Sequence, residues 1–118
     1  MFIFKDGVTL FGEFLKTEFS VENIEFWLAC EDYRNTEKEQ KLASKARKIL
    51  VDFVQIGAQR EVNLEIELRK RTETLIENPT FETFERAQRR IQVLMEKDSY
   101  PRFLESDLYK DLCRVVDT

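Results

Sequence analysis

Histidine is absent from this chain of 118 residues, and its absence removes several kinds of chemistry. Histidine is the commonest general base near neutral pH, the usual partner of a nucleophilic serine or cysteine, and a frequent zinc ligand. The three glycines, Gly7, Gly12 and Gly57, stand too far apart to form a glycine-rich phosphate-binding loop. We therefore expect neither an enzyme with catalytic residues of its own nor a bound cofactor or metal.

Glycine and proline are also scarce, with three and two residues. An all-β domain of this length needs a turn about every 8–12 residues, and such turns depend on these two residue types. No apolar run approaches the roughly 18 residues that a membrane-spanning helix needs. The scarcity of turn residues predicts an all-α fold.

Positive charge is not in excess, because 23 acidic residues outnumber 19 basic ones and the formal net charge is −4. General nucleic-acid binding needs a basic surface, so we expect no nucleic-acid partner. Only two cysteines are present, Cys30 and Cys113, and each lies in an apolar helical pattern. Unclustered thiols without a secretion signal are typical of reduced core residues in a cytoplasmic protein.

The sequence does contain enough apolar material for a core. Hydrophobic residues make up 42% of the chain, and ten residues are phenylalanine. The length is one domain's worth, so we expect residues 1–118 to form a single domain that is a monomer by default. The opening Met1-Phe2-Ile3-Phe4 is too short for a signal-peptide core and indicates a trimmed domain start, with the first helix cut short.

Apolar residues recur at the i, i+3, i+4 spacing of one helix face in successive segments. This spacing predicts seven to nine short helices, the clearest of them over Val8–Leu15, Ser20–Glu31, Leu42–Val54, Phe84–Met95 and Ser106–Val116. Between them, Gln59–Leu68 stays ambiguous between extended and helical structure. On the second helix, the pattern predicts that Ile24, Trp27 and Leu28 face the core.

Three predicted breaks between helices are rich in polar residues: Glu18–Asn23, Leu75–Thr80 and Asp98–Arg102. Loops at one end of a helical bundle can converge and offer their polar groups to a partner. Two interpretations stay open. The side chains either cap their helices, with Asp98 or Ser99 starting a short helix, or they form a contact surface. Arg102 is either a plain surface residue or the i, i+4 ion-pair partner of Asp98.

One segment carries the motif Glu18-Phe19-Ser20-x-Glu22-Asn23-Ile24-Glu25-Phe26-Trp27-Leu28-Ala29-Cys30-Glu31-Asp32-Tyr33. This motif resembles the first signature of the regulators of G-protein signalling, the RGS domain. Further motifs follow in the family's order and spacing: Lys45-Ala46-Arg47-Lys48-Ile49, Glu61-Val62-Asn63-Leu64, Pro79-Thr80, Phe84-x-x-Ala87-Gln88 and Leu94-Met95-Glu96-Lys97-Asp98-Ser99-Tyr100-Pro101-Arg102-Phe103-Leu104. The resemblance covers residues 6–113. It implies an all-α fold of about nine helices, with an antiparallel four-helix bundle and a terminal helical subdomain.

The resemblance also implies a function. RGS domains accelerate GTP hydrolysis by the α subunits of heterotrimeric G proteins (Gα), whose switch regions they bind in the conformation of the transition state, and Gα carries its catalytic arginine in cis. The expected partner is thus Gα in its GTP-bound or transition-state form, at the inner face of the plasma membrane. By resemblance, the residues that contact Gα are Glu18, Phe19, Glu22, Asn23, Leu94, Asp98, Ser99 and Arg102, with Arg102 holding the Asp98 carboxylate.

The middle break departs from the family pattern at Leu75, which we also count among the Gα contacts. The resemblance assigns to Leu75 the position at which many active members carry an asparagine that reaches the glutamine orienting the attacking water. Because leucine makes no hydrogen bond, the sequence predicts a lower maximal rate or an altered Gα preference, and a gain from Leu75→Asn. The alternative function is a catalytically silent RGS-like scaffold or adaptor for other signalling proteins.

Exposed basic groups complete the inventory of the chain. Lys41, Lys45 and Lys48 form a helical stripe that is either a solvated face or a site for anionic lipid. Arg69-Lys70-Arg71 and Arg89-Arg90 are likewise predicted to be exposed, and no aromatic residues interleave with them as single-stranded nucleic-acid binding requires.

Overall fold

The computed structural model describes the backbone of residues 5–18 and 20–117 and the side chains of residues 9–18, 20–111 and 113. Every regular element in these ranges is helical, which confirms the predicted all-α class. In chain order the elements are α1 (Lys5–Thr17), α2 (Glu22–Arg34), the 3-10 turn η1 (Glu39–Lys41), α3 (Leu42–Ile49), the π-helical η2 (Leu50–Val54), α4 (Ile66–Ile76), α5 (Glu85–Leu94), the π-helical η3 (Met95–Ser99), α6 (Tyr100–Leu104) and α7 (Asp107–Asp117). The described ranges thus hold seven α-helices, where the sequence predicts about nine helices.

Two predictions fall outside the described residues. Phe19, a predicted contact residue, is one of them, and Met1–Phe4, where the first helix is predicted to be cut short, are the others. In the part of the chain that the structure describes, no helix combines the length and the apolar character needed to cross a membrane.

The chain divides into two compact units. Met1–Val21 and Val93–Thr118 form the terminal unit, and Glu22–Gln92 form the central unit. The two units correspond to the predicted terminal subdomain and helix bundle. The terminal unit is assembled from the two ends of the chain, whereas the central unit is continuous in sequence.

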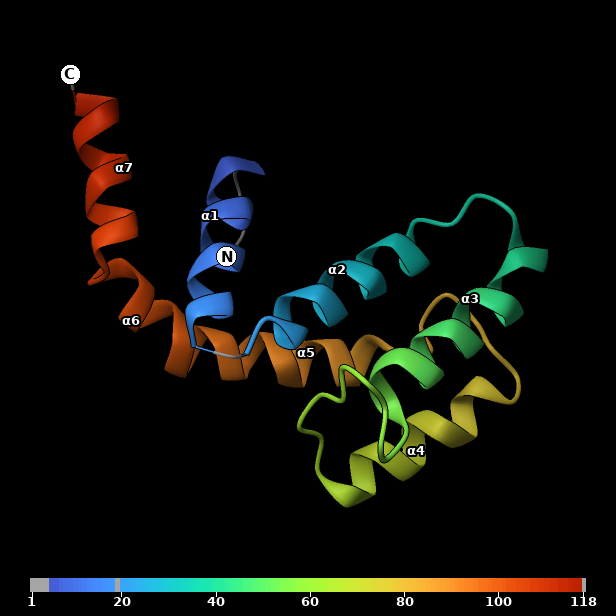
Figure 1. The fold of residues 1–118 in the computed structure, drawn as a ribbon. Coiled ribbons are helices and arrows are strands. Elements are labelled where there is room, and N and C mark those ends of the chain that lie inside the picture. The colour runs from blue at the N-terminus through green and yellow to red at the C-terminus, as the bar shows by residue number, and fades with distance from the viewer. Residues whose placement is uncertain (1–4, 19, 118) are drawn as a thin grey trace. The chain divides into compact units, whose positions relative to one another are not determined.

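The central unit is an antiparallel bundle in which α2, α3 with η2, α4 and α5 alternate in direction (Figure 1). Edge-to-face aromatic pairs fill its core: Phe26 contacts Phe53 with ring centroids 5.6 Å apart, and Tyr33 contacts Phe84 at 5.0 Å. Such pairs contribute about 0.5–1.5 kcal/mol beyond the area they bury. The Tyr33 hydroxyl also donates to the carbonyl of Thr80 at 2.6 Å, which fixes the break after α4 against the last turn of α2.

The buried face of α2 differs from the predicted one. Leu28 is 43% exposed and Trp27 is only partly buried, with its indole N–H donating to Gln92 Oε1 at 3.0 Å. The helix carries apolar residues on more than one side, so the spacing alone does not select a face. Packing against both α3 and α5 selects it, and the buried residues are Asn23, Ile24, Phe26, Cys30 and Tyr33.

Cys30 is the core residue that the sequence predicts, at 2% exposure. Burial raises the pKa of its thiol well above the ordinary value, because the thiolate would lose its hydration. Cys30 is therefore a neutral, apolar part of the bundle interior.

The core of the terminal unit is aromatic. Phe103 of α6 contacts Phe11 and Phe14 of α1 at centroid distances of 5.2 and 5.7 Å, and Tyr109 of α7 at 5.4 Å.

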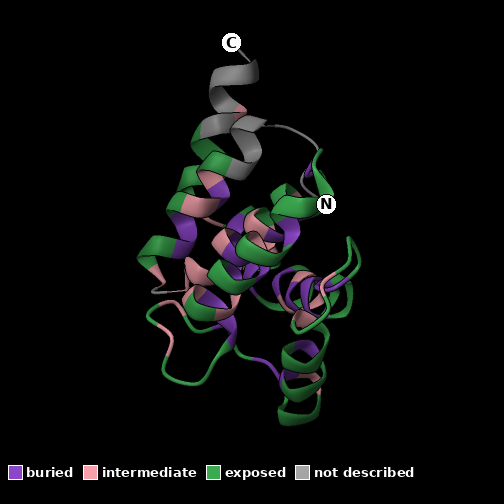
Figure 2. Ribbon diagram, turned by 90° about the vertical axis from the view of Figure 1, so that its right-hand side faces the viewer, coloured by how far each residue is buried: buried purple, intermediate pink, exposed green. Residues whose placement is uncertain are grey.

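The start of α7 is capped as predicted, because Ser106 Oγ accepts a hydrogen bond from the Tyr109 backbone N–H at 3.3 Å. Along the helices, buried positions alternate with exposed ones, as expected for helices that each bury one stripe (Figure 2).

The break predicted at Asp98–Arg102 is not present in the backbone. η3 leads directly into α6, with Ser99 and Tyr100 both in the right-handed helical region and no side-chain cap at Ser99. Pro101 lies within this helical run and has no N–H to donate to it, and the π-helical turn before it is the kind of single-turn irregularity that occurs inside α-helices. The prediction that Asp98 or Ser99 caps a new helix is wrong.

Candidate functional site

In the terminal unit, Arg102 holds two carboxylates from distant parts of the chain. Its Nε and Nη2 donate to the two oxygens of Glu18 at 3.0 and 2.7 Å, in the bidentate geometry that suits a guanidinium. Its Nη1 donates to Asp98 Oδ1 at 2.6 Å and to the Asp98 carbonyl at 3.1 Å. The predicted Asp98–Arg102 ion pair is confirmed. The pairing with Glu18, which follows α1 directly, joins residues 84 positions apart, and the helical spacing of one segment cannot reveal it.

The electrostatics of this cluster follow from its charges. The hydrogen bonds that the Arg102 guanidinium donates to Glu18 and then to Asp98 raise its pKa above the ordinary value. Asp98 is exposed, and both carboxylates keep lone pairs that Arg102 does not use. The cluster can therefore present oriented acceptors to the backbone N–H groups of a partner.

Two other predicted contact residues lie on the same helical run. Leu94, the last residue of α5, is half-buried, and Ser99 is 3% exposed. Ser99 therefore offers little surface to a partner and is a buried residue at the end of η3.

Glu22 and Asn23 begin α2 in the central unit. Glu22 is half-buried and Asn23 is 8% exposed. Glu22 is an acidic residue in the first turn and interacts favourably with the positive end of the helix dipole, and Asn23 is buried, so both residues have a structural role beside any contact role. The helix starts at Glu22, within two residues of the predicted cap at Ser20.

The loop of residues 55–65, which we call the Asn63 loop, lies at the same end of the bundle as the start of α2. Arg60 in this loop donates to Glu25 Oε2 in the first turn of α2 at 2.9 Å. Within the loop, Asn63 is exposed, whereas its neighbours Val62 and Leu64 are 0% and 5% exposed. Two buried anchors therefore present one amide side chain to solvent.

Arg69 of α4 fixes the Asn63 loop from inside the protein. Its guanidinium donates to the backbone carbonyl of Val54, to that of Val62 at 3.1 Å and to that of Leu64 at 3.3 Å. The prediction that Arg69 is exposed is wrong, since the residue is 7% exposed. The sequence predicts no contact role for Asn63, although its motif belongs to the family resemblance. A polar residue between two apolar ones in a non-helical segment is the signal that could have identified it.

Leu75 lies at the opposite end of the bundle from Glu22 and Asn23. It is in the last turn of α4, whose axis carries it more than about 13 Å from the start of that helix. The segment after α4 packs on the last turn of α2, through the Tyr33–Thr80 hydrogen bond, and not on the first turn. Leu75 is 38% exposed, but the structure does not bring it together with Glu22 and Asn23. The convergence that loops at one end of a bundle can show does not occur between Leu75 and the start of α2.

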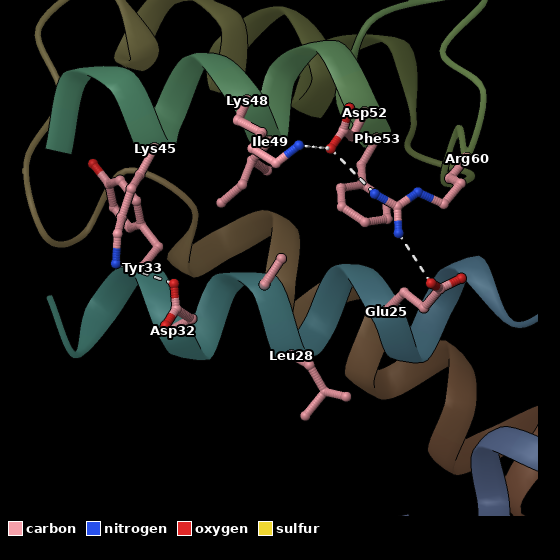
Figure 3. A pocket seen from close by; sticks show the side chains of 11 residues that line it. Glu25, Leu28, Asp32, Tyr33, Lys45, Lys48, Ile49, Asp52, Phe53 and Arg60 are labelled. Carbon is pink, nitrogen blue, oxygen red and sulfur yellow. Dashed lines mark hydrogen bonds and ion pairs between the residues drawn. The ribbon is translucent and has the colours of Figure 1, made fainter. Parts of the chain in front are cut away.

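Lys45 and Lys48 of the predicted lysine stripe line a groove of about 340 Å³ between α2 and α3 (Figure 3). Lys45 donates to Asp32 at 3.1 Å, and Lys48 donates to Asp52 at the same distance. Lys41 is exposed. Pairing with carboxylates weakens the positive potential that an anionic lipid would need. Of the three lysines, Lys41 is therefore the one whose charge is most available to such a lipid.

Comparison with known proteins adds independent information. A family model for the regulator of G protein signaling domain matches residues 2–112. The human protein "Regulator of G-protein signaling 8" is 51% identical over 108 residues, which is 92% of this chain, and the proteins of the same name from Macaca fascicularis and Rattus norvegicus are 51% and 50% identical. The chain spans 60%, 55% and 60% of the length of these three relatives.

Proposed function

Since this chain belongs to the family of regulator of G protein signaling domains, we propose that it accelerates GTP hydrolysis by a Gα subunit. It would do so by binding the switch regions in their transition-state conformation, at the membrane face where Gα is anchored. The observation that carries the proposal is the Arg102 cluster, which holds the Glu18 and Asp98 carboxylates in one fixed arrangement.

The mechanism needs no reactive group from this chain. Phosphoryl transfer depends chiefly on positioning and on electrostatic stabilisation, and Gα contributes its own arginine. A partner that holds mobile switch loops in the reactive geometry removes a conformational cost from the barrier. A hundredfold acceleration corresponds to about 2.7 kcal/mol of preferential binding to the transition state. About two or three hydrogen bonds of roughly 1 kcal/mol each supply that amount.

The defining experiment compares two states of one Gα subunit. The isolated domain should bind Gα loaded with GDP and aluminium fluoride, which mimics the transition state, more tightly than Gα loaded with GDP alone. It should also accelerate single-turnover GTP hydrolysis by at least one member of a Gα panel. Equal binding to both states, with no acceleration of any member, would favour the scaffold alternative. The scaffold alternative draws support from Leu75, which lacks the amide of many active members, but Leu75 lies away from Glu22 and Asn23.

Arg102→Met tests the cluster itself. We expect at least about a tenfold loss of acceleration, because charge-assisted hydrogen bonds to Glu18 and Asp98 are lost and both carboxylates become mobile. Stability should change by less than about 1 kcal/mol, since the ion pairs are exposed. Single-turnover hydrolysis and urea unfolding measure the two quantities. Lys16→Met, which removes the exposed Lys16–Glu13 ion pair of α1, is the matched control and should leave both unchanged. Equal activity of the two variants would contradict the role of Arg102.

A further inference from the structure

Arg60 joins three parts of the central unit through one guanidinium (Figure 3). Its Nη1 donates to Glu25 of α2 at 2.9 Å, and its Nη2 donates to Asp52 of η2 at 3.1 Å. The guanidinium carbon also lies 4.4 Å from the centroid of the Phe53 ring, which is the geometry of a cation–π contact. The residue itself belongs to the Asn63 loop, so it ties that loop to two helical elements at once.

The Asn63 loop is held on its other side by backbone contacts and by Arg69. The backbone N–H groups of Arg60 and Val62 donate to the carbonyls of Asp52 and Phe53 at 3.1 and 2.9 Å. These bonds and the Arg69 guanidinium anchor the loop to η2 and α4. Arg60 extends from this anchored loop to Glu25 in the first turn of α2. The Arg60–Glu25 ion pair therefore helps to fix the position of Asn63 relative to the residues that begin α2.

We propose that Arg60 is a positioning residue for Gα activation, which couples the Asn63 loop to the start of α2. Through this coupling the amide of Asn63 and the polar groups of Glu22 and Asn23 meet Gα as one preorganised surface. The inference rests on the proposed function and extends it, because Arg60 acts through other residues and need not touch Gα. Preorganisation of this kind saves the ordering cost that a mobile loop would incur on binding.

The exposure of the ion pairs separates this role from a structural one. Arg60 and Glu25 have 39% and 37% of their side-chain surface exposed, so the pair adds little to global stability. A residue that mattered only for folding would change the unfolding midpoint and the activity together. A positioning residue changes the affinity for the transition-state complex at nearly constant stability.

The test uses Arg60→Met, which keeps an apolar side chain over Phe53 but removes both ion pairs. Its affinity for Gα loaded with GDP and aluminium fluoride should fall about fivefold. Glu25→Gln should have a similar effect, and Arg60→Lys should restore part of the affinity because it keeps a positive charge. Lys45→Met is the matched control: it breaks an ion pair between α2 and α3 in the same groove, with a similarly exposed cation at 34%, but at the far end from the Asn63 loop. The control should lose less than twofold.

A double variant completes the design. If Arg60 acts through Asn63, the effects of Arg60→Met and Asn63→Ala on affinity should sum to more than the effect of the double variant. Equal losses for Arg60→Met and Lys45→Met, or fully additive losses for Arg60→Met and Asn63→Ala, would overturn the inference while the wild-type domain remained an activator. A wild-type domain that accelerates no Gα subunit would instead overturn the proposed function.

Discussion

Arg69→Met is expected to lower the free energy of unfolding by about 3 kcal/mol or more, the largest stability effect that we predict. The side chain is 7% exposed, and its guanidinium satisfies the carbonyls of Val54, Val62 and Leu64. Methionine fills a similar volume but donates no hydrogen bond, so the Val54 and Leu64 carbonyls lose this donor, whereas the Val62 carbonyl keeps the Leu64 backbone N–H at 3.1 Å. Leaving a buried polar group unsatisfied costs about 1–3 kcal/mol each.

Urea unfolding monitored through Trp27 fluorescence measures this loss. Arg71→Met is the control, because Arg71 is exposed on the same helix, and its effect should stay within about 0.5 kcal/mol. If both variants unfolded at the same urea concentration, water must replace the Arg69 guanidinium without penalty. The account of a rigid Asn63 loop would then be wrong.

Asn63→Ala should reduce the acceleration of GTP hydrolysis by about tenfold or more, the largest functional effect that we expect besides that of Arg102→Met. Asn63 presents a donor and an acceptor on a loop that Arg60 and Arg69 hold in place. A positioned amide is suited to orient a polar side chain of the G protein. Because Asn63 is exposed, the substitution should leave stability within about 0.5 kcal/mol.

The substitution Leu75→Asn distinguishes the expectation based on the sequence from the expectation based on the structure. From the sequence alone, this substitution should raise the rate, whereas the position of Leu75 at the other end of the bundle predicts almost no change. Single-turnover hydrolysis with Asn63→Ala, Leu75→Asn and the control Asn78→Ala decides between the two. Asn78 is another exposed asparagine, located beyond α4. A gain from Leu75→Asn together with full activity of Asn63→Ala would restore the interpretation based on the sequence.

The features that the sequence predicts well are local ones. Helical spacing identifies the run Leu42–Val54, which the structure forms as α3 and η2, and the Ser106 cap of α7 follows from a short segment. These features depend on residues within one or two turns of each other. Local physical chemistry therefore determines them, and periodicity and capping rules detect them.

The features that the sequence misses depend on contacts between distant segments. The buried face of α2 is chosen by its neighbours, because apolar residues lie on several of its sides. In the sequence, Arg69 belongs to a run of basic residues that is typical of a surface. Only the fold brings the carbonyls of the Asn63 loop to its guanidinium. The end of the bundle at which Leu75 lies follows from the alternating direction of the helices, and no motif in its own segment reports that.

The division of the chain has a consequence for how the molecule is made. The central unit is complete once residue 92 has been synthesised, whereas the terminal unit needs its C-terminal half before α1 finds a partner. The Glu18–Arg102 contact closes a loop of 84 residues, and closing so long a loop late is favoured when the intervening chain is already compact. We expect the bundle to fold first on the ribosome and the Arg102 cluster to assemble after it, once the segment that carries Arg102 has emerged.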